Sequence, residues 1–268
     1  MARRQHRVVV PSDDNLSHAV PKCVFLADRD IGLELMTYVL DAHLSHVSCV
    51  VTMEENEITK LVHSSGRRCI AFQELNGTNA ETLLGPVDFL FLLWWPTIIP
   101  KYLVELPKNG TINLHPSLLP YDRGKHYNFW TIVDGTPFGV TIHFVDAGVD
   151  SGDILFQAPI PKTWDDTGGS LYNKAIGAVR KLFKERYLDI VEGRYSRSPQ
   201  DPLKATMHFA RDLESASEIF LERQYTALTL FNLLRARTFE GKPACYFRAD
   251  GKKYEVRISI SEVGDGSD

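Results

Sequence analysis

Short apolar runs alternate with amphipathic segments along the first half of the chain. The run at residues 22–27 (KCVFLA) predicts a buried strand, and residues 31–43 carry apolar side chains at helical spacing. The same alternation predicts a strand at 46–53, a helix at 57–64, a strand at 68–72 and a central strand at 87–95 that is buried on both faces. Strands alternating with helices indicate right-handed crossovers. We therefore expect an α/β fold, a doubly wound and mainly parallel sheet with helices on both sides.

Beyond residue 111 the pattern predicts further strands, one long helix and a small appendage. A strand is expected to end at 113–115, where Pro116 stops it, and Arg123-Gly124 is expected to open the next helix. Apolar residues at helical spacing predict a long helix over 167–191. The remaining expected elements are a strand at 140–145, a turn-rich linker at 193–202, a helix at 226–238, and strands at 244–248 and 254–260.

These elements divide the chain into three parts. Residues 1–20 are expected to form a flexible arm, 21–195 the main domain, and 203–262 a small α+β region of one helix and a β-hairpin. Asp250-Gly251 is a strong signal for the hairpin turn. Apolar and polar side chains alternate in the second hairpin strand, so one apolar face must be covered, either by the main domain or by a second copy of the chain.

Charge and hydropathy exclude some classes of partner. The net charge of −4 and the pI of about 6.1 give no global reason to bind a polyanion, so no nucleic-acid partner is expected. The most hydrophobic run, residues 87–99, contains Asp88 and Pro96 and is too short to span a bilayer. No apolar leader follows the basic N-terminal residues. We expect a cytoplasmic protein that does not contact a membrane.

Common cofactor motifs are missing from the sequence. The turn after the first expected strand, residues 28–32, lacks the glycine pattern of a dinucleotide site, and no Walker A loop occurs. The cysteines are scattered without metal-ligand spacing, and we expect them to be small buried hydrophobes in strands. They are Cys23, Cys49, Cys69 and Cys245. No bound metal is expected.

The residues with the most chemical potential lie between positions 111 and 152. Asn113 and His115 are two residues apart in an extended strand, so their side chains point to the same side. An acidic loop with two glycines, residues 146–152, follows the strand at 140–145. Ligands of open α/β sheets bind at the carboxyl ends of strands. The loops in question follow Ala27, Trp95, Leu114 and Val145.

The order and spacing of these residues resemble those of the folate-dependent formyltransferases. The matching parts are N-L-H-P-S-L-L-P at 113–120 with Arg123-Gly124, then G-V-T-I at 139–142, then D-A-G-V-D-S-G at 146–152. The resemblance implies a Rossmann-like formyltransferase fold and transfer of a formyl group from a folate to an amine.

By this resemblance Asn113, His115 and Asp150 are the catalytic residues. Attack of a neutral amine on the formyl carbon makes the carbonyl oxygen negative, and N–H groups of Asn113 and His115 can donate to it. Loss of one such donor typically costs about 10²–10³ in rate. Asp150 is expected to hold His115 in a useful protonation state or to accept, directly or through water, the proton shed by the amine.

The resemblance also implies N10-formyltetrahydrofolate as co-substrate. Its flat pterin is expected between the segment after the central strand and the acidic loop, with recognition largely by backbone groups. The residues assigned to it are Trp94, Trp95, Pro96, Thr97, Ile98, Ile99, Asp146, Ala147 and Gly148.

The amine acceptor implied by the resemblance is a nucleotide-linked amino sugar, such as the dTDP-sugars of lipopolysaccharide O-antigen. Cationic side chains beside His115 suit a diphosphate, and neighbouring tyrosines suit a sugar or a base. The candidate acceptor residues are Arg29, Tyr121, Arg123, Gly124, Lys125, His126 and Tyr127. The nucleotide (dTDP, GDP or UDP) stays open. The sugar enzymes also imply a homodimer formed partly through residues 203–262.

Three alternatives remain. Methionyl-tRNA or glycinamide ribonucleotide can be the acceptor, although the expected basic C-terminal domain of the tRNA enzymes is missing. Formyltetrahydrofolate hydrolases resemble the same core and deliver the formyl group to water. A folate-binding module without activity is disfavoured by the complete Asn113, His115 and Asp150 set.

Overall fold

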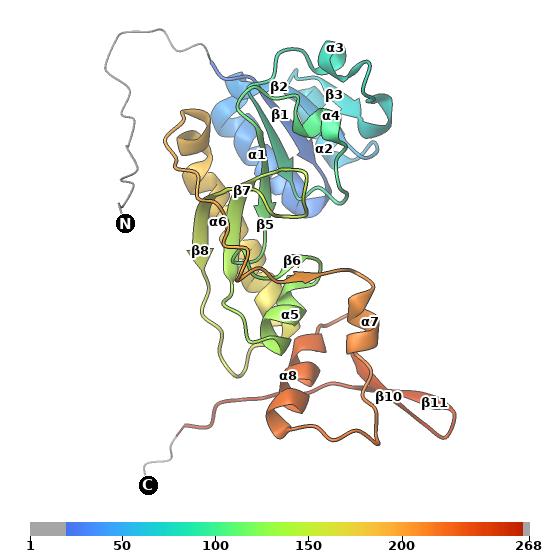
Figure 1. Cartoon of the computed structure of the whole chain (residues 1–268). Helices are drawn as coiled ribbons and strands as arrows, with labels where there is room; N and C mark the ends of the chain where they lie inside the picture. The colour runs from blue at the N-terminus through green and yellow to red at the C-terminus, as the bar shows by residue number, and fades with distance from the viewer. Residues whose placement is uncertain (1–19, 265–268) are drawn as a thin grey trace, which may run out of the picture.

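The structure, a computed structural model, describes residues 20–264 (Figure 1). The arm expected at residues 1–20 lies outside this range except for its last residue. The main sheet has seven strands: β1 (Cys23–Ala27), β2 (Val47–Thr52), β3 (Cys69–Ala71), β4 (Phe89–Leu93), β5 (Thr111–His115), β7 (Gly139–Phe144) and β8 (Ile154–Pro159). The helices are α1 (Arg29–His43), α2 (Glu57–Ser64), α3 (Ala80–Leu84), α4 (Lys101–Val104), α5 (Tyr127–Val133), α6 (Gly168–Val191), α7 (Asp212–Ala216) and α8 (Ala227–Arg237).

The sheet has the strand order β3-β2-β1-β4-β5-β7-β8. The first five strands of this order are parallel, and β7 and β8 continue the sheet in antiparallel pairing. The expected doubly wound, mainly parallel sheet is therefore confirmed. The direction of winding changes between β1 and β4, so the loops after Ala27 and Leu93 flank the switch point at which such sheets bind ligands.

The central strands are buried on both faces, as their unbroken apolar sequence predicts. Cys23, Phe25 and Ala27 of β1 lie in the core that α1 and α6 cover, whereas Val24 and Leu26 lie in the core that α3 and α4 cover. Residues of β4 divide between the two cores in the same way. This period of two leaves no face of β1 or β4 exposed to solvent.

A small C-terminal region follows the main sheet. It contains α7, α8 and the hairpin of β10 (Cys245–Ala249) and β11 (Lys252–Val256). Asp250 and Gly251 both have positive φ, 49° and 72°, as the predicted two-residue turn requires. Gly168, the first residue of α6, lies so close to the carbonyl of Ala236 that a Cβ atom would collide with it, and this contact fixes α8 against α6.

Three of the expected elements are corrected here. Arg123–Gly124 is not a helix start but the short strand β6, paired with β9 (Met207–His208), and helix α5 begins only at Tyr127. The partner strand lies 84 residues later, which local spacing cannot reveal. Strand β8, most of whose residues are not buried, was not expected. The last hairpin strand spans Lys252–Val256 rather than 254–260.

The turn-rich linker expected at 193–202 is attached to the main sheet at one point. Ser198 pairs with Ile154 of β8 through two backbone hydrogen bonds of 2.9 and 3.0 Å, so this part of the linker lies against the main sheet.

The cysteines are free, and three of them are buried as expected. Burial raises the pKa of Cys23, Cys49 and Cys245 to about 12, so these thiols are protonated near neutral pH. Cys69 is only half-buried. Between residues 20 and 264, none of the helices is long and apolar enough to cross a bilayer.

Candidate active site

The strand β5 presents Asn113 and His115 on one face, and Asp150 lies against both. Asn113 Nδ2 donates to Asp150 Oδ1 over 3.4 Å, and His115 Nδ1 lies 3.5 Å from Asp150 Oδ2. The other ring nitrogen of His115, Nε2, lies 3.2 Å from the carbonyl oxygen of Asp122. The three predicted catalytic residues are thus brought together, with Asp150 bridging the two side chains of β5.

Asp150 is held as a carboxylate in a constrained position. Its φ of 50° lies in the left-handed region, which Asp tolerates better than most residues. The Gly124 N–H donates to Oδ2 over 2.9 Å. Burial alone raises the pKa of Asp150, but the neighbouring His115 and His143 and the Gly124 N–H outweigh it, so this pKa lies below its ordinary value. The group is therefore ionised at neutral pH and can accept a proton or a hydrogen bond.

A fourth polar residue, His143, completes the cluster and was missed from the sequence. It stands opposite Asn113 in the antiparallel pairing of β5 with β7 and is only 1% exposed. Its Nδ1 lies 2.7 Å from the Phe144 carbonyl, an acceptor, so Nδ1 carries the hydrogen and Nε2 accepts from Asn113 Nδ2 over 3.3 Å. Burial lowers the pKa of His143 to about 4, which keeps it neutral. The sequence does show a histidine within the β-branched run at 140–145. It does not show that this histidine pairs with Asn113.

These contacts engage both hydrogens of the Asn113 amide. One is directed at Asp150 Oδ1 and the other at His143 Nε2. His143 and Asp150 therefore fix the orientation of the amide, with its nitrogen toward these two residues. For Asn113 to donate to a developing oxyanion, one of the two hydrogen bonds must be replaced.

Sequence comparison assigns the family of this site. Residues 51–186, about half of the chain, match the sequence model of the formyl transferase family. The chain belongs to the formyl transferase family. Residues 212–262 match the model described as the N-formyltransferase dimerization C-terminal domain. The first match includes the whole Asn113, His115 and Asp150 cluster, and the second includes the C-terminal hairpin.

Individual relatives differ in their acceptors. A methionyl-tRNA formyltransferase of Listeria monocytogenes is 32% identical over 177 residues, which are 66% of this chain and 55% of the relative. The chain thus spans about half the length of the curated relatives it matches. A 4-N formyltransferase from Francisella tularensis has a TM-score of 0.76 at 23% identity, over 91% of this chain and 99% of that chain, a likeness that shows the fold.

A further solved formyltransferase carries both of its ligands. The formyltransferase PseJ from Anoxybacillus kamchatkensis, in complex with UDP-4,6-dideoxy-4-formamido-L-AltNAc and tetrahydrofolate, is 27% identical with a TM-score of 0.53. The likeness covers 72% of this chain and 88% of that chain.

The segment that the formyltransferase resemblance assigns to folate lies beside the triad. Residues 94–99 follow β4, the strand next to β5, while Asp146, Ala147 and Gly148 follow β7 on its other side. The catalytic strand thus runs between the two segments. Because β7 is antiparallel to β5, the loop after Val145 starts at the opposite edge of the sheet from the loop after β4, and not at the shared edge that was expected. Asp146 Oδ1 accepts from the Gly148 N–H and the Ser151 hydroxyl over 3.0 and 2.7 Å, which shapes the acidic loop from within.

The two tryptophans of this segment face opposite cores. Trp94 has a φ of 61° and packs edge-on against Tyr172, with ring centroids 6.5 Å apart. Trp95 packs against Phe72 on the other face at 5.1 Å. Both are half-buried, whereas Ile98 is 84% exposed and Ile99 is buried. Of the two residues that follow Trp95, Pro96 is half-buried and Thr97 is exposed.

The candidate acceptor residues of this formyltransferase-family chain divide into two groups. The first group lies beside Asp150 and His115 and consists of Gly124 at the end of β6 and of Lys125, His126 and Tyr127, which lead into α5. Tyr121 precedes them and is half-buried. Arg29 lies apart, after β1, and its exposed guanidinium is 3.6 Å from the Asp28 carboxylate.

Charge is concentrated around His126. Burial is the largest cause that lowers the pKa of His126, and the positive charges of Arg237 and Lys125 lower it further. Arg237 belongs to α8, so the C-terminal region adds a cation near the catalytic loop. Arg123, by contrast, is not free, because its guanidinium donates to Gln200.

A buried carboxyl lies behind His115. Asp122 is 1% exposed and accepts from the Thr136 hydroxyl over 2.6 Å. Burial is the main cause that raises the pKa of Asp122 to about 6, and the negative charge of Asp134 adds to it, while His208 and Lys162 oppose it. Asp122 is therefore a group whose ionisation is unfavourable in the folded protein.

This shift predicts a pH dependence of stability. Between about pH 4 and 6 the folded protein keeps a proton on Asp122 that the unfolded chain, with a pKa of 3.8, has released. The unfolding free energy contributed by Asp122 therefore falls as pH rises through this window, by about 3 kcal/mol in total. Asp122→Asn cannot titrate and is expected to lack this fall.

Urea unfolding of both proteins between pH 4 and 8 measures the difference. His143 titrates in the same window in both proteins, so its contribution cancels. The variant is expected to gain about 3 kcal/mol relative to the native protein as pH rises, and a difference that does not change with pH contradicts the assignment.

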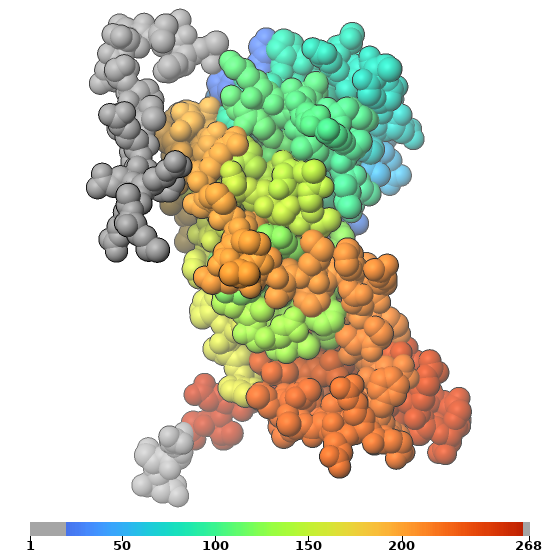
Figure 2. Space-filling view, in the orientation of Figure 1, coloured from blue at the N-terminus to red at the C-terminus, as the bar shows by residue number. Residues whose placement is uncertain are grey.

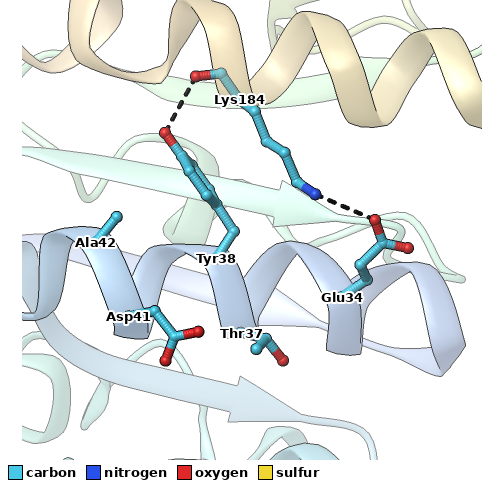
Figure 3. A pocket seen from close by; sticks show the side chains of 6 residues that line it. All are labelled: Glu34, Thr37, Tyr38, Asp41, Ala42 and Lys184. Atoms are coloured by element: carbon cyan, nitrogen blue, oxygen red, sulfur yellow. Dashed lines mark hydrogen bonds and ion pairs between the residues drawn. The ribbon is translucent and has the colours of Figure 1, made fainter.

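The hollow drawn in Figure 3 lies elsewhere. It has a volume of about 460 Å³ between α1 and α6 and is lined by Tyr38, Lys184, Glu34 and their neighbours. The Tyr38 hydroxyl donates to the Lys184 carbonyl over 3.1 Å, and Lys184 Nζ contacts Glu34 over 3.2 Å (Figure 3). None of its lining residues belongs to the catalytic, folate or acceptor sets.

Proposed function

We propose that this chain transfers the formyl group of N10-formyltetrahydrofolate to the amino group of a nucleotide-linked amino sugar. The observation that carries the proposal is the cluster of Asn113, His115 and Asp150 at the carboxyl end of β5, with Asp150 within 3.5 Å of both partners. Membership of the formyl transferase family supports the reaction class. The complex of the 27% identical PseJ supports a folate and a nucleotide sugar as the ligand pair.

The residues supply what formyl transfer requires. As the amine nitrogen attacks the formyl carbon, the carbonyl oxygen becomes negative, and N–H groups of Asn113 and His115 donate to it. The His115 Nε2–H must leave the Asp122 carbonyl, 3.2 Å away, to do so. The Asn113 hydrogen now directed at Asp150 or His143 turns to this oxygen. The attacking nitrogen gains a positive charge, and the ionised Asp150 accepts its proton directly or through water. The oxyanion then re-forms the carbonyl, the bond between the carbon and the folate nitrogen breaks, and that nitrogen takes up a proton, returned by Asp150 directly or through water, so that tetrahydrofolate leaves.

Several features favour a sugar acceptor over initiator tRNA. The match to methionyl-tRNA formyltransferases is limited to 177 residues and 55% of the relative. The C-terminal residues instead match an N-formyltransferase domain, and the net charge is −4. Lys125 and Arg237, the two positive charges around His126, lie near the triad and suit a diphosphate.

An acceptor screen tests the proposal. The purified protein is incubated with N10-formyltetrahydrofolate and a panel of dTDP-, GDP- and UDP-linked amino sugars, and products are detected by mass spectrometry as a gain of one formyl group. Methionyl-tRNA and glycinamide ribonucleotide serve as competing acceptors, and formate is measured without any amine. Formylation of a nucleotide amino sugar supports the proposal; activity confined to another amine, or formate release alone, overturns it.

We also propose that residues 203–262 form a homodimer contact, with 21–195 as the catalytic domain. Within the stretch that matches the dimerization domain, exposed apolar side chains recur at Phe220, Leu221, Leu228 and Phe231, each 44–57% exposed. Single side chains of this kind are common on surfaces, but a group within one small region favours a protein contact.

Light scattering is expected to give the mass of a dimer. Leu221→Glu with Phe231→Glu is expected to shift the protein to monomer, because two charges would be buried without partners. Leu203→Glu is the matched control, since Leu203 is 94% exposed and lies outside the matched stretch. A native monomer, or a dimer that both sets of variants leave unchanged, contradicts the assignment.

A further inference from the structure

The segment at residues 198–208, here called the linking segment, lies against the catalytic loops. Neither family match includes it, because one ends at residue 186 and the other begins at 212. It starts with the pairing of Ser198 to β8 and ends as β9, paired with β6. In Figure 2 this orange stretch crosses the green and yellow surface of the main sheet. The linking segment is thus paired with strands of the catalytic domain at both of its ends.

Gln200 makes the central contacts of the linking segment. Its Nε2 donates to the carbonyl oxygens of Asp150 and Gly152 over 2.8 and 2.7 Å. Its Oε1 accepts from Nε and Nη2 of Arg123 over 3.0 and 2.7 Å. All the hydrogen-bonding groups of this half-buried amide are therefore engaged, two with the acidic loop and one with β6.

The contacts of Gln200 hold the two segments around Asp150, the acidic loop and β6. Asp150 has left-handed φ, a conformation that is unfavourable for a non-glycine residue unless its surroundings hold it. Its carboxylate accepts from the N–H of Gly124, the residue directly after Arg123. Gln200 therefore joins the loop that carries the carboxylate to the strand that carries the carboxylate's backbone donor.

We propose that Gln200 is a positioning residue for the Asp150 carboxylate. It acts through the acidic loop and β6 and makes no contact with substrate. Without its two donors, the Asp150 and Gly152 carbonyls lose their partners and the loop is free to leave the position that brings the carboxylate to His115 and Asn113. The inference rests on the formyl transfer proposed above, and it adds a residue outside both family matches to that site.

Two substitutions test the donor and the acceptor contacts of Gln200. Gln200→Glu keeps acceptors for Arg123 but presents negative oxygens to the two loop carbonyls, whereas Gln200→Leu removes every hydrogen bond. Both are expected to lower kcat at least 10-fold while changing KM for the folate less than about 3-fold, with Gln200→Glu at least as severe as Gln200→Leu. Lys204→Gln is the control, because the exposed Lys204 side chain pairs with Asp201 and, among the described residues, makes no hydrogen bond to the catalytic loops.

A readout that needs no turnover accompanies the kinetics. Carboxyl ¹³C NMR titration of Asp150 is expected to show a higher pKa in Gln200→Leu, because the loop no longer places the carboxylate at the Gly124 N–H beside His115, His143 and Lys125. Unchanged kcat and an unchanged Asp150 titration in folded variants overturn the positioning role. If the native protein formylates no acceptor, the proposed function fails, and the titration still decides the role of Gln200.

Discussion

Asp150→Asn is expected to lower kcat for formyl transfer by about 10²–10⁴ while the protein stays folded. The substitution removes the negative charge beside His115 and the group proposed to accept the amine's proton. If the new amide nitrogen takes the place of Oδ2, it also faces the Gly124 N–H, so two donors meet where one carboxylate oxygen accepted. Both effects act on the transition state more than on binding, so KM is expected to change little.

Steady-state kinetics with the acceptor identified in the screen measure this loss. Asp153→Asn is the matched control, because it removes the same charge directly after the acidic loop from a side chain without a hydrogen bond among the described residues. The control is expected to keep near-native kcat. Near-native activity of Asp150→Asn would remove Asp150 from the mechanism, and an equal loss in both variants would indicate a nonspecific effect of charge.

The parts of the fold that depend on local pattern could be predicted from the sequence. The apolar runs of β1 and β4 indicated strands buried on both faces, and Leu26 and Phe25 do lie in different cores. Asn113 and His115 point to one side because strand geometry alone requires it. The motif match then assigned Asp150 to the same site, and its carboxylate does lie within 3.5 Å of both side chains.

The missed parts depend on which distant segments pair. His143 enters the cluster only through its antiparallel register with Asn113. Strand β6 exists only because β9 lies beside it, and Gly124 allows that approach, since a Cβ there would collide with the His208 carbonyl. Gln200 reaches Asp150 from 50 residues away. A single sequence gives spacing but not partners, so these contacts could not be inferred from it.

Asn113→Ala is expected to lower kcat by about 10²–10³, the usual effect of losing one oxyanion donor. It also leaves His143 Nε2 and Asp150 Oδ1 without the amide they share, so the unfolding free energy must be measured beside the kinetics.

The double variant Asn113→Ala with Asp150→Asn shows whether the two residues act as one unit. If they acted independently, their losses would multiply to about 10⁴ or more. Because one hydrogen bond joins Asn113 to Asp150, removing either already disturbs the other, and the double variant is expected to be little slower than Asp150→Asn alone. Multiplied losses would instead mean that the Asn113 amide leaves Asp150 before the reaction and stabilises the oxyanion without any dependence on the carboxylate.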